Sequence, residues 1–136
     1  VDTGKAVATL EGCHDLVECI AFSPDGTMVA AAGSDKTARI WNVADGGLRR
    51  TFSGHTRVVI DCAFAPNQKL LATASSDATA RIWDVDTGEV RDIFPSGDHR
   101  SRGCAFSPDG KLLIATATSS ERILLLYDTV TGTSRG

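Results

Sequence analysis

Histidine, cysteine and aspartate are the residue types in this chain that could bind a metal, act as a nucleophile or transfer protons. The 136 residues include three histidines and four cysteines, Cys13, Cys19, Cys62 and Cys104. No two cysteines have the Cys-x-x-Cys spacing of a zinc site. No nucleophile, base and orienting group recur together, and no glycine-rich phosphate loop is present. We therefore expect no catalytic residue, no metal and no cofactor.

A repeat of 42 residues organises the chain. Arg39-Ile40-Trp41 recurs 42 residues later as Arg81-Ile82-Trp83, and Ala63-Phe64 recurs at the same offset as Ala105-Phe106. A period of this length indicates an array of small supersecondary units.

Short apolar runs alternate with turn residues inside each period. In the second copy the runs cover residues 59–64, 70–74, 79–83 and 90–94, and turn residues separate them. Runs of about five residues with such boundaries predict β-strands, and no window has a sustained helical period. Four strands per period predict a propeller blade, so the expected fold class is all-β.

The chain resembles the WD40 repeat family over nearly its whole length. The motifs that carry the resemblance are Gly54-His55, the Ser-Pro-Asp-Gly turns, Ser76-Asp77 and Trp83-Asp84, in order and at one period. The resemblance implies blades of four antiparallel strands, named a to d from the central channel outward. It places strand d near Lys5–Leu10, Leu48–Phe52 and Val90–Phe94.

The expected organisation is one WD40 region of three repeats, at about 1–42, 43–84 and 85–128, with the start of a further strand at 129–136. We expect the third blade to lack a complete fourth strand. Propellers close with about four to eight blades. The chain is therefore expected to be a piece of a longer propeller or, as the alternative, a self-completing oligomer.

A buried hydrogen-bond relay within a blade is implied by the family resemblance. The second copy supplies all four members: His55, Thr73, Asp77 and Trp83. The first copy keeps Asp35 and Trp41 but has Ala31 and Cys13 at the other two positions. The third copy has Gly97 and Tyr127 at relay positions and an unusual turn at 119–122. We expect the second blade to be the most rigid and the third the most irregular, with His14 and His99 on the surface.

Two cysteines occupy equivalent positions on strand a. Cys62 and Cys104 stand where the first copy has Ile20, so both are expected to be small buried hydrophobic residues. Such positions on neighbouring blades are expected to lie too far apart for a disulfide. A reducing intracellular compartment, cytoplasmic or nuclear, is the corresponding expectation.

The resemblance also indicates where partners would dock. In the family this is the face that carries the d–a and b–c connections. The positions that map onto it are Leu16, Glu18, Ser34, Val58, Ile60, Ser76, Arg100 and Arg102. An apolar centre beside arginines suits protein–protein contact. The alternative is that Val58 and Ile60 pack within their blade.

Charge and hydropathy limit the class of partner. The net charge is −3, which indicates no general attraction to nucleic acid or to anionic membranes, and no apolar run approaches the length of a membrane span. The predicted function is a non-catalytic scaffold for protein–protein interaction within a larger assembly. The alternatives are the propeller portion of a larger enzyme or of a nucleotide-dependent switch protein, and a self-completing homo-oligomeric propeller.

Overall fold

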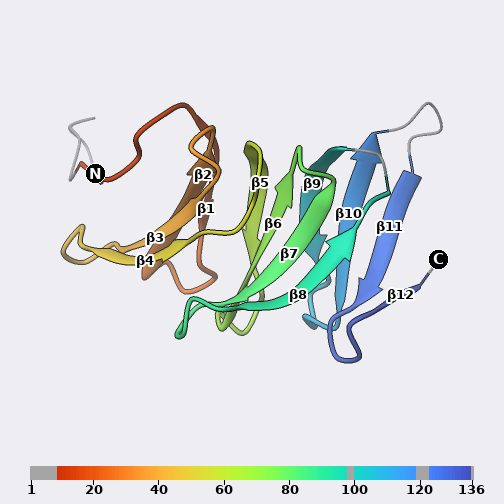
Figure 1. Cartoon of the computed structure of the whole chain (residues 1–136). Helices are drawn as coiled ribbons and strands as arrows, with labels where there is room; N and C mark the ends of the chain where they lie inside the picture. Colours follow the sequence, from red (N-terminus) through yellow and green to blue (C-terminus); the bar gives the residue numbers. More distant parts are fainter. Residues whose placement is uncertain (1–8, 98–99, 119–122, 136) are drawn as a thin grey trace, which may run out of the picture.

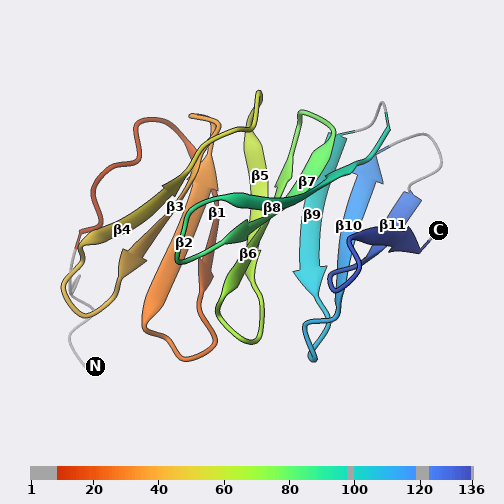
Figure 2. The same cartoon turned by 60° about the horizontal axis from the view of Figure 1, so that its bottom comes forward.

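The computed structural model describes residues 9–97, 100–118 and 123–135, and its regular elements are β-strands. Three four-stranded antiparallel sheets stand side by side, each with its strands in chain order (Figure 1; Figure 2). Blade 1 consists of β1 (Val17–Phe22), β2 (Met28–Gly33), β3 (Ala38–Asn42) and β4 (Leu48–Phe52). Blade 2 consists of β5 (Val59–Phe64), β6 (Leu70–Ser75), β7 (Thr79–Asp84) and β8 (Val90–Pro95). Blade 3 consists of β9 (Arg100–Phe106), β10 (Leu112–Thr118), β11 (Ile123–Asp128) and β12 (Thr133–Arg135). The all-β prediction is confirmed.

The predicted strands at the two ends of the chain compare differently with the structure. The short strand β12 pairs with β11 through three residue pairs and lies within the further strand expected to begin at 129–136. The strand predicted over Lys5–Leu10 falls mostly on residues 1–8, outside the described residues, and Thr9 and Leu10 lie in no strand. His99 and the turn at 119–122 also lie outside the described residues.

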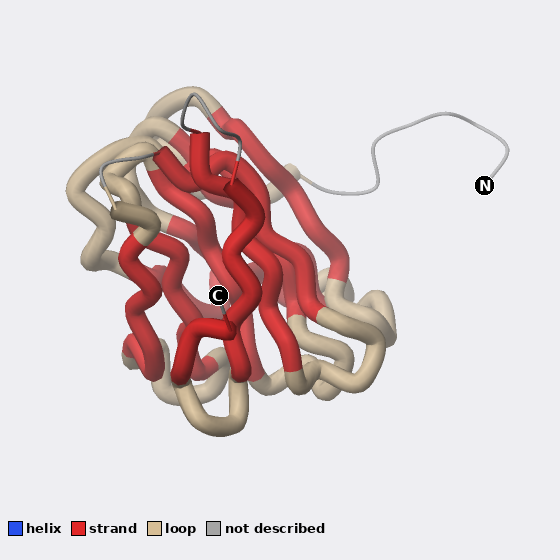
Figure 3. The backbone as a smooth tube through the Cα atoms, turned by 90° about the vertical axis from the view of Figure 1, so that its right-hand side faces the viewer, coloured by secondary structure: helices blue, strands red, loops and turns tan. Residues whose placement is uncertain are grey.

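Aspartates build the tight turns that connect the strands. Asp25 accepts hydrogen bonds from the Ser23 hydroxyl and from the backbone and hydroxyl of Thr27. Bonds of this kind stabilise the ionised carboxylate, and the pKa of Asp25 is lowered, with the Thr27 backbone as the largest cause. Turns and loops gather at two opposite ends of the sheets (Figure 3).

The hydrophobic core lies between the blades. Neighbouring blades are in contact along their first strands, β1 with β5 and β5 with β9. Between blades 1 and 2 the ring of Trp83 packs on Phe52, with ring centres 5.6 Å apart. Between blades 2 and 3, Phe94 stacks on Tyr127 at 4.1 Å. Side chains on alternate positions of one strand face opposite sides, so the sheet of blade 2 contributes to both cores.

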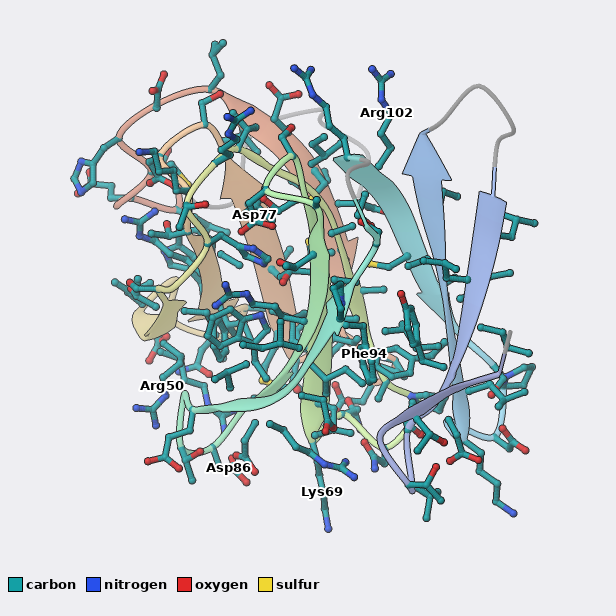
Figure 4. The ribbon with its side chains drawn as sticks, turned by 45° about the vertical axis from the view of Figure 1, so that its right-hand side comes forward. Arg50, Lys69, Asp77, Asp86, Phe94 and Arg102 are labelled. Atoms are coloured by element: carbon teal, nitrogen blue, oxygen red, sulfur yellow. The ribbon has the colours of Figure 1, made fainter. Side chains whose placement is uncertain are left out.

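Polar contacts join neighbouring blades near one end of the sheets. Arg49 of blade 1 pairs with the Asp86 carboxylate of blade 2 at 3.1 Å, and Arg50 donates to the Asp86 carbonyl (Figure 4). Arg91 of blade 2 donates to the Thr129 carbonyl of blade 3 at 2.6 Å. These contacts fix how the blades sit against one another at that end.

Two cysteines of neighbouring blades, at positions that are not equivalent in the repeat, lie close together. The Sγ atoms of Cys19 in β1 and Cys62 in β5 are 3.0 Å apart, and both residues are free thiols. Cys62 is buried as expected, whereas Cys104 is only partly buried. We had compared equivalent positions, Cys62 and Cys104. The contact instead joins Cys19 of blade 1 to Cys62 of blade 2, and position 62 is equivalent to position 20 rather than to position 19.

Blade 2 holds the four predicted relay residues in one hydrogen-bonded chain. Trp83 Nε1 donates to Thr73 Oγ1 at 2.8 Å, and Thr73 Oγ1 lies 2.7 Å from His55 Nε2. His55 Nδ1 lies 2.7 Å from Asp77 Oδ2. If Thr73 donates to Nε2 and the Nδ1 proton goes to Asp77, every donor in the chain has an acceptor. The relay therefore fixes the Asp77 turn to the buried centre of the blade.

The relay shifts the pKa of both titratable members downward. Burial lowers the pKa of the His55 imidazole below its ordinary 6.5, and the contact with Asp77 offsets this only in part. Burial acts to raise the pKa of Asp77, but hydrogen bonds from Thr79 and His55 outweigh it and hold that pKa below 3.8. At neutral pH the pair is thus a neutral imidazole beside a carboxylate.

Gly54, which precedes the relay histidine, has a backbone that other residues rarely adopt. Its φ is +146°, and a Cβ at this position would lie 2.7 Å from the Arg81 guanidinium and 3.3 Å from the Trp83 ring. Glycine is therefore required here for both its backbone conformation and its size.

The other predicted relay residues, Asp35 and Trp41, have different partners. Trp41 Nε1 donates to the carbonyl of Glu11 at 2.8 Å. Asp35 pairs with Arg39 and accepts from the Thr37 hydroxyl at 2.8 Å. Ala31 offers no hydroxyl that could join them, so the structure forms no relay across blade 1. In blade 3 the Tyr127 hydroxyl donates to the Pro95 carbonyl at 3.4 Å.

The outward-facing sides of blades 1 and 3 expose large apolar side chains. On β1 the side chains of Ile20 and Phe22 are 73% and 67% exposed, and on β11 Leu124 is 64% exposed. Contiguous exposed apolar surface of this kind promotes association. Among the described residues there is no helix that could cross a membrane.

We predict that replacing His55 by Ala lowers the free energy of unfolding by about 1–3 kcal/mol, because the buried Thr73 hydroxyl and the Asp77 carboxylate each lose a partner. Replacing the exposed His14 by Ala is the matched control and should cost far less. Urea denaturation of the two variants measures the difference. Equal losses would show that the relay contributes nothing.

The relay also predicts a dependence of stability on pH. A group whose pKa is lower in the folded state takes up a proton on unfolding, so acid favours the unfolded chain. The contribution of His55 is complete above its unfolded pKa of 6.5 and is lost as the pH falls from there toward its folded pKa. The slope is at most about 1.4 kcal/mol per pH unit for one proton. Urea denaturation at several pH values between 7 and 5 should show a shallower slope for His55→Gln. Parallel slopes would contradict the assignment.

We predict that the 136-residue chain associates as its concentration rises, since Ile20 and Phe22 expose apolar surface. Static light scattering should show a mass that increases with concentration. The double variant Ile20→Thr, Phe22→Thr should shift the chain toward monomer, whereas Val43→Thr, an apolar-to-polar control at an exposed turn, should not. A compact monomer at every concentration would overturn this prediction.

Candidate functional site

The predicted docking positions lie at the end of the sheets that carries the Asp77 turn. We call this end the Asp77 face and define it by the β2–β3 and β6–β7 turns and by the segments that lead into β1, β5 and β9. Figure 4 shows Asp77 and Arg102 at this end and Lys69 and Asp86 at the opposite end.

The first predicted pairs hold equivalent places in blades 1 and 2. The Leu16 carbonyl accepts from the Ser34 backbone at 2.9 Å, and the Val58 carbonyl accepts from the Ser76 backbone at 3.0 Å. In both blades this bond joins the start of the first strand to the turn that follows the second strand. The structure therefore brings these four residues to the same face.

Three further predicted residues, Glu18, Ile60 and Arg102, sit at a repeated irregularity of the first strand. In blade 1 the paired residue on β1 advances by two, from Val17 to Cys19, while the paired residue on β2 advances by one. Glu18 is therefore an additional residue with no pairing partner on β2. The same shift leaves Ile60 extra in blade 2. In blade 3 the shift falls between Ser101 and Cys104 and includes Arg102. A β-bulge bends the strand and redirects a side chain, so each blade carries one redirected position on this face.

An open hollow crosses the Asp77 face and draws residues from all three blades. Its walls come from the β2–β3 turn, residues 56–58, the β6–β7 turn and the start of β9. The lining residues are Lys36, Thr56, Arg57, Val58, Ser76, Asp77, Ala78, Gly97 and Arg100. Two of the predicted contact residues from blade 2 and one from blade 3 therefore share this hollow.

The hollow is cationic. Lys36, Arg57 and Arg100 have exposed side chains, and Arg102 is exposed nearby on the same face. The acidic residue of the lining, Asp77, already accepts hydrogen bonds from His55, Thr79 and the Thr56 backbone. Its carboxylate is directed into the blade, and its single negative charge is outnumbered by the basic side chains of Lys36, Arg57 and Arg100.

The predicted apolar patch is only partly formed. Leu16 is 70% exposed, but Val58 and Ile60 are half-buried, which agrees in part with the alternative that they pack within blade 2. The described residues contain no group of three or more His, Cys, Asp or Glu side chains that could hold a metal ion. The arrangement is suited to binding a surface of opposite charge.

Sequence reasoning missed two cations of the hollow, Lys36 and Arg57. Lys36 follows the turn residue Asp35 with a φ of +69°, as Ala78 follows Asp77 with a φ of +68°. An alignment of the two copies would have marked Lys36 as a turn-tip position. Arg57 has no such signal, because its equivalent in the first copy is Asp15.

The comparisons with known proteins agree with the fold. The family described as "WD domain, G-beta repeat" matches residues 4–42, 46–84 and 88–128. The chain is 42% identical over 55 residues to nuclear distribution protein nudF 2 of Penicillium rubens, which covers 40% of this chain and 12% of that protein. It is 41% identical over 61 residues to nuclear distribution protein PAC1 of Arthroderma benhamiae, covering 45% of this chain and 13% of the relative.

A human relative is similar over a segment of nearly the same length. WD repeat domain-containing protein 83 of Homo sapiens is 40% identical over 57 residues, covering 42% of this chain and 18% of the relative. The matched segments thus span less than a fifth of these relatives. The three family matches, by contrast, cover most of the chain at the repeat period seen in its sequence and its sheets. The chain belongs to the WD40 repeat family.

Proposed function

We propose that this chain is part of a non-catalytic WD40 scaffold that binds an acidic segment of a protein partner, within a larger assembly, through the Asp77 face. WD-repeat proteins generally serve as protein-interaction scaffolds, and their family is typically non-catalytic. The observation that carries the proposal is the cationic hollow, in which three successive blades each contribute an exposed basic side chain.

Charge complementarity supports an acidic partner. The chain as a whole carries a net charge of −3. The basic side chains in this hollow therefore form a local surface whose charge is opposite in sign to that of the whole chain. Lys36, Arg57 and Arg100 come from different blades, which makes the positive surface a property of the assembled fold. Complementary charge steers the approach of a partner and selects against wrong ones.

Rigidity supports the same function. The Asp77 turn is tied to the buried Trp83 through His55 and Thr73. A surface that is already ordered loses little conformational entropy when it binds. The relay would thus hold the centre of the hollow in its binding shape.

The redirected bulge positions support specificity. Glu18, Ile60 and Arg102 occupy the same place in successive blades but differ in charge and polarity. A common frame that presents different side chains at equivalent sites selects its partner by those side chains. The proposal places the protein inside the cell, cytoplasmic or nuclear, because free thiols such as those of Cys13 and Cys62 persist in reducing compartments.

We predict that Arg57→Ala and Arg102→Ala each weaken binding of the partner by about 1–2 kcal/mol, as expected for arginines near the centre of an interface. Lys69→Ala is the matched control, because Lys69 is an exposed cation on the opposite end (Figure 4). Affinity capture with the full-length protein would identify partners, and isothermal titration calorimetry would then compare the three variants.

Salt gives an independent check of the same proposal. Binding through exposed charges should weaken as ionic strength rises, and the dependence should be smaller for Arg57→Ala than for Lys69→Ala. If Lys69→Ala lost as much affinity as the arginine variants, the docking surface would lie elsewhere.

A further inference from the structure

Two cysteine side chains meet at the junction of blades 1 and 2. The thiols of Cys19 on β1 and Cys62 on β5 are hydrogen-bonded to each other, with their Sγ atoms 3.0 Å apart. The two cysteines are 43 residues apart in sequence, and both are free thiols. β1 and β5 are the contacting first strands of the two blades. No comparable contact joins Cys13 or Cys104 to another cysteine among the described residues.

We propose that Cys19 and Cys62 form a redox-modification site, which a small-molecule disulfide oxidises to a disulfide bond between blades 1 and 2. This inference does not depend on the proposed function. The two sulfurs already touch, so the bond requires them to close a short remaining gap. In a reducing compartment such a bond is transient and serves to sense oxidant.

The reaction balances as two exchanges. The Cys19 thiolate attacks one sulfur of the oxidant RSSR, the S–S bond of the oxidant breaks, and RS⁻ leaves and takes up the proton that Cys19 gave. The Cys62 sulfur then attacks the Cys19 sulfur of the mixed disulfide, and the second RS⁻ leaves with the Cys62 proton. Two cysteine thiols are oxidised and one RSSR is reduced to two RSH.

The different surroundings of the two sulfurs set the order of these steps. Cys19 is partly exposed, so an oxidant can reach it, whereas Cys62 is 5% exposed. The hydrogen bond with Cys19, together with burial, raises the pKa of the Cys62 thiol well above its ordinary range. Cys62 therefore stays protonated until Cys19 has reacted, and it acts as the resolving sulfur.

Cys104 is the most similar alternative and is set apart by its contacts. Its backbone donates to Asp61 Oδ2 at 3.0 Å, so blade 3 meets an aspartate where blade 2 meets Cys19. Burial, and then the negative charge of Asp61, raise the pKa of the Cys104 thiol well above its ordinary range. Both effects disfavour the thiolate that exchange needs. The thiol pair forms between blades 1 and 2 because blade 1 has Cys19 at the position where blade 2 has Asp61.

The test is oxidation of the reduced protein by oxidised glutathione at neutral pH, with remaining thiols blocked by iodoacetamide. Digestion after Glu18 separates Cys13 from Cys19, and digestion after Lys69 and Arg102 separates Cys62 from Cys104. Mass spectrometry should find one dominant cross-linked peptide pair, which contains Cys19 and Cys62. Its formation should raise the unfolding midpoint Tm, and dithiothreitol should reverse the shift.

Four variants make the result decisive. Cys13→Ser and Cys104→Ser are the controls and should keep both the cross-link and the Tm shift. Cys19→Ser should lose both. Cys62→Ala should lose the cross-link and accumulate glutathione on Cys19, which tests the order of steps even if this variant is less stable. A dominant Cys62–Cys104 or Cys13 cross-link, or glutathione spread over all four cysteines without a cross-link, would overturn the proposal.

Discussion

The middle sheet is apolar on both of its faces, and the need to cover both is the constraint that arranges the molecule. Trp83 packs on Phe52 of blade 1, while Phe94 stacks on Tyr127 of blade 3. Because the middle sheet buries one face against blade 1 and the other against blade 3, the blades stand side by side with their turns at two common ends. That stacking brings basic side chains of three blades into one hollow, although they are far apart in the sequence.

Burial also decides how the polar groups of each blade are satisfied. A buried polar network is stable when every member has a partner. Blade 2 meets this requirement with the chain from Trp83 to Asp77. In blade 1, which has no hydroxyl at position 31, the indole of Trp41 donates to the Glu11 carbonyl instead. The blades thus satisfy their buried polar groups by different means, and in blade 2 the relay also ties the interior to a surface turn.

The first strands meet in a staggered way that has chemical consequences. Position 19 of blade 1 contacts Cys62 of blade 2, which is equivalent to position 20. Asp61, equivalent to position 19, bonds in the same way to the backbone of Cys104 in blade 3. One geometric rule therefore gives a thiol pair at the first junction and a carboxylate–amide bond at the second. Residue identity at two positions per blade sets the chemistry of each junction.

Periodicity and turn chemistry determined the blades, because strands of alternating burial and aspartate or glycine turns are local properties of the sequence. The relay of His55 was also predictable, because the resemblance to the WD40 family implies it and the second copy has all four residue types in place. Three features depended on the tertiary structure. Strand pairing placed the bulges at Glu18, Ile60 and Arg102, which no residue type signals. Packing of separate blades gathered Lys36, Arg57 and Arg100. The stagger between first strands brought Cys19 to Cys62, because a repeat alignment compares equivalent positions, whereas neighbouring blades touch through positions one residue apart.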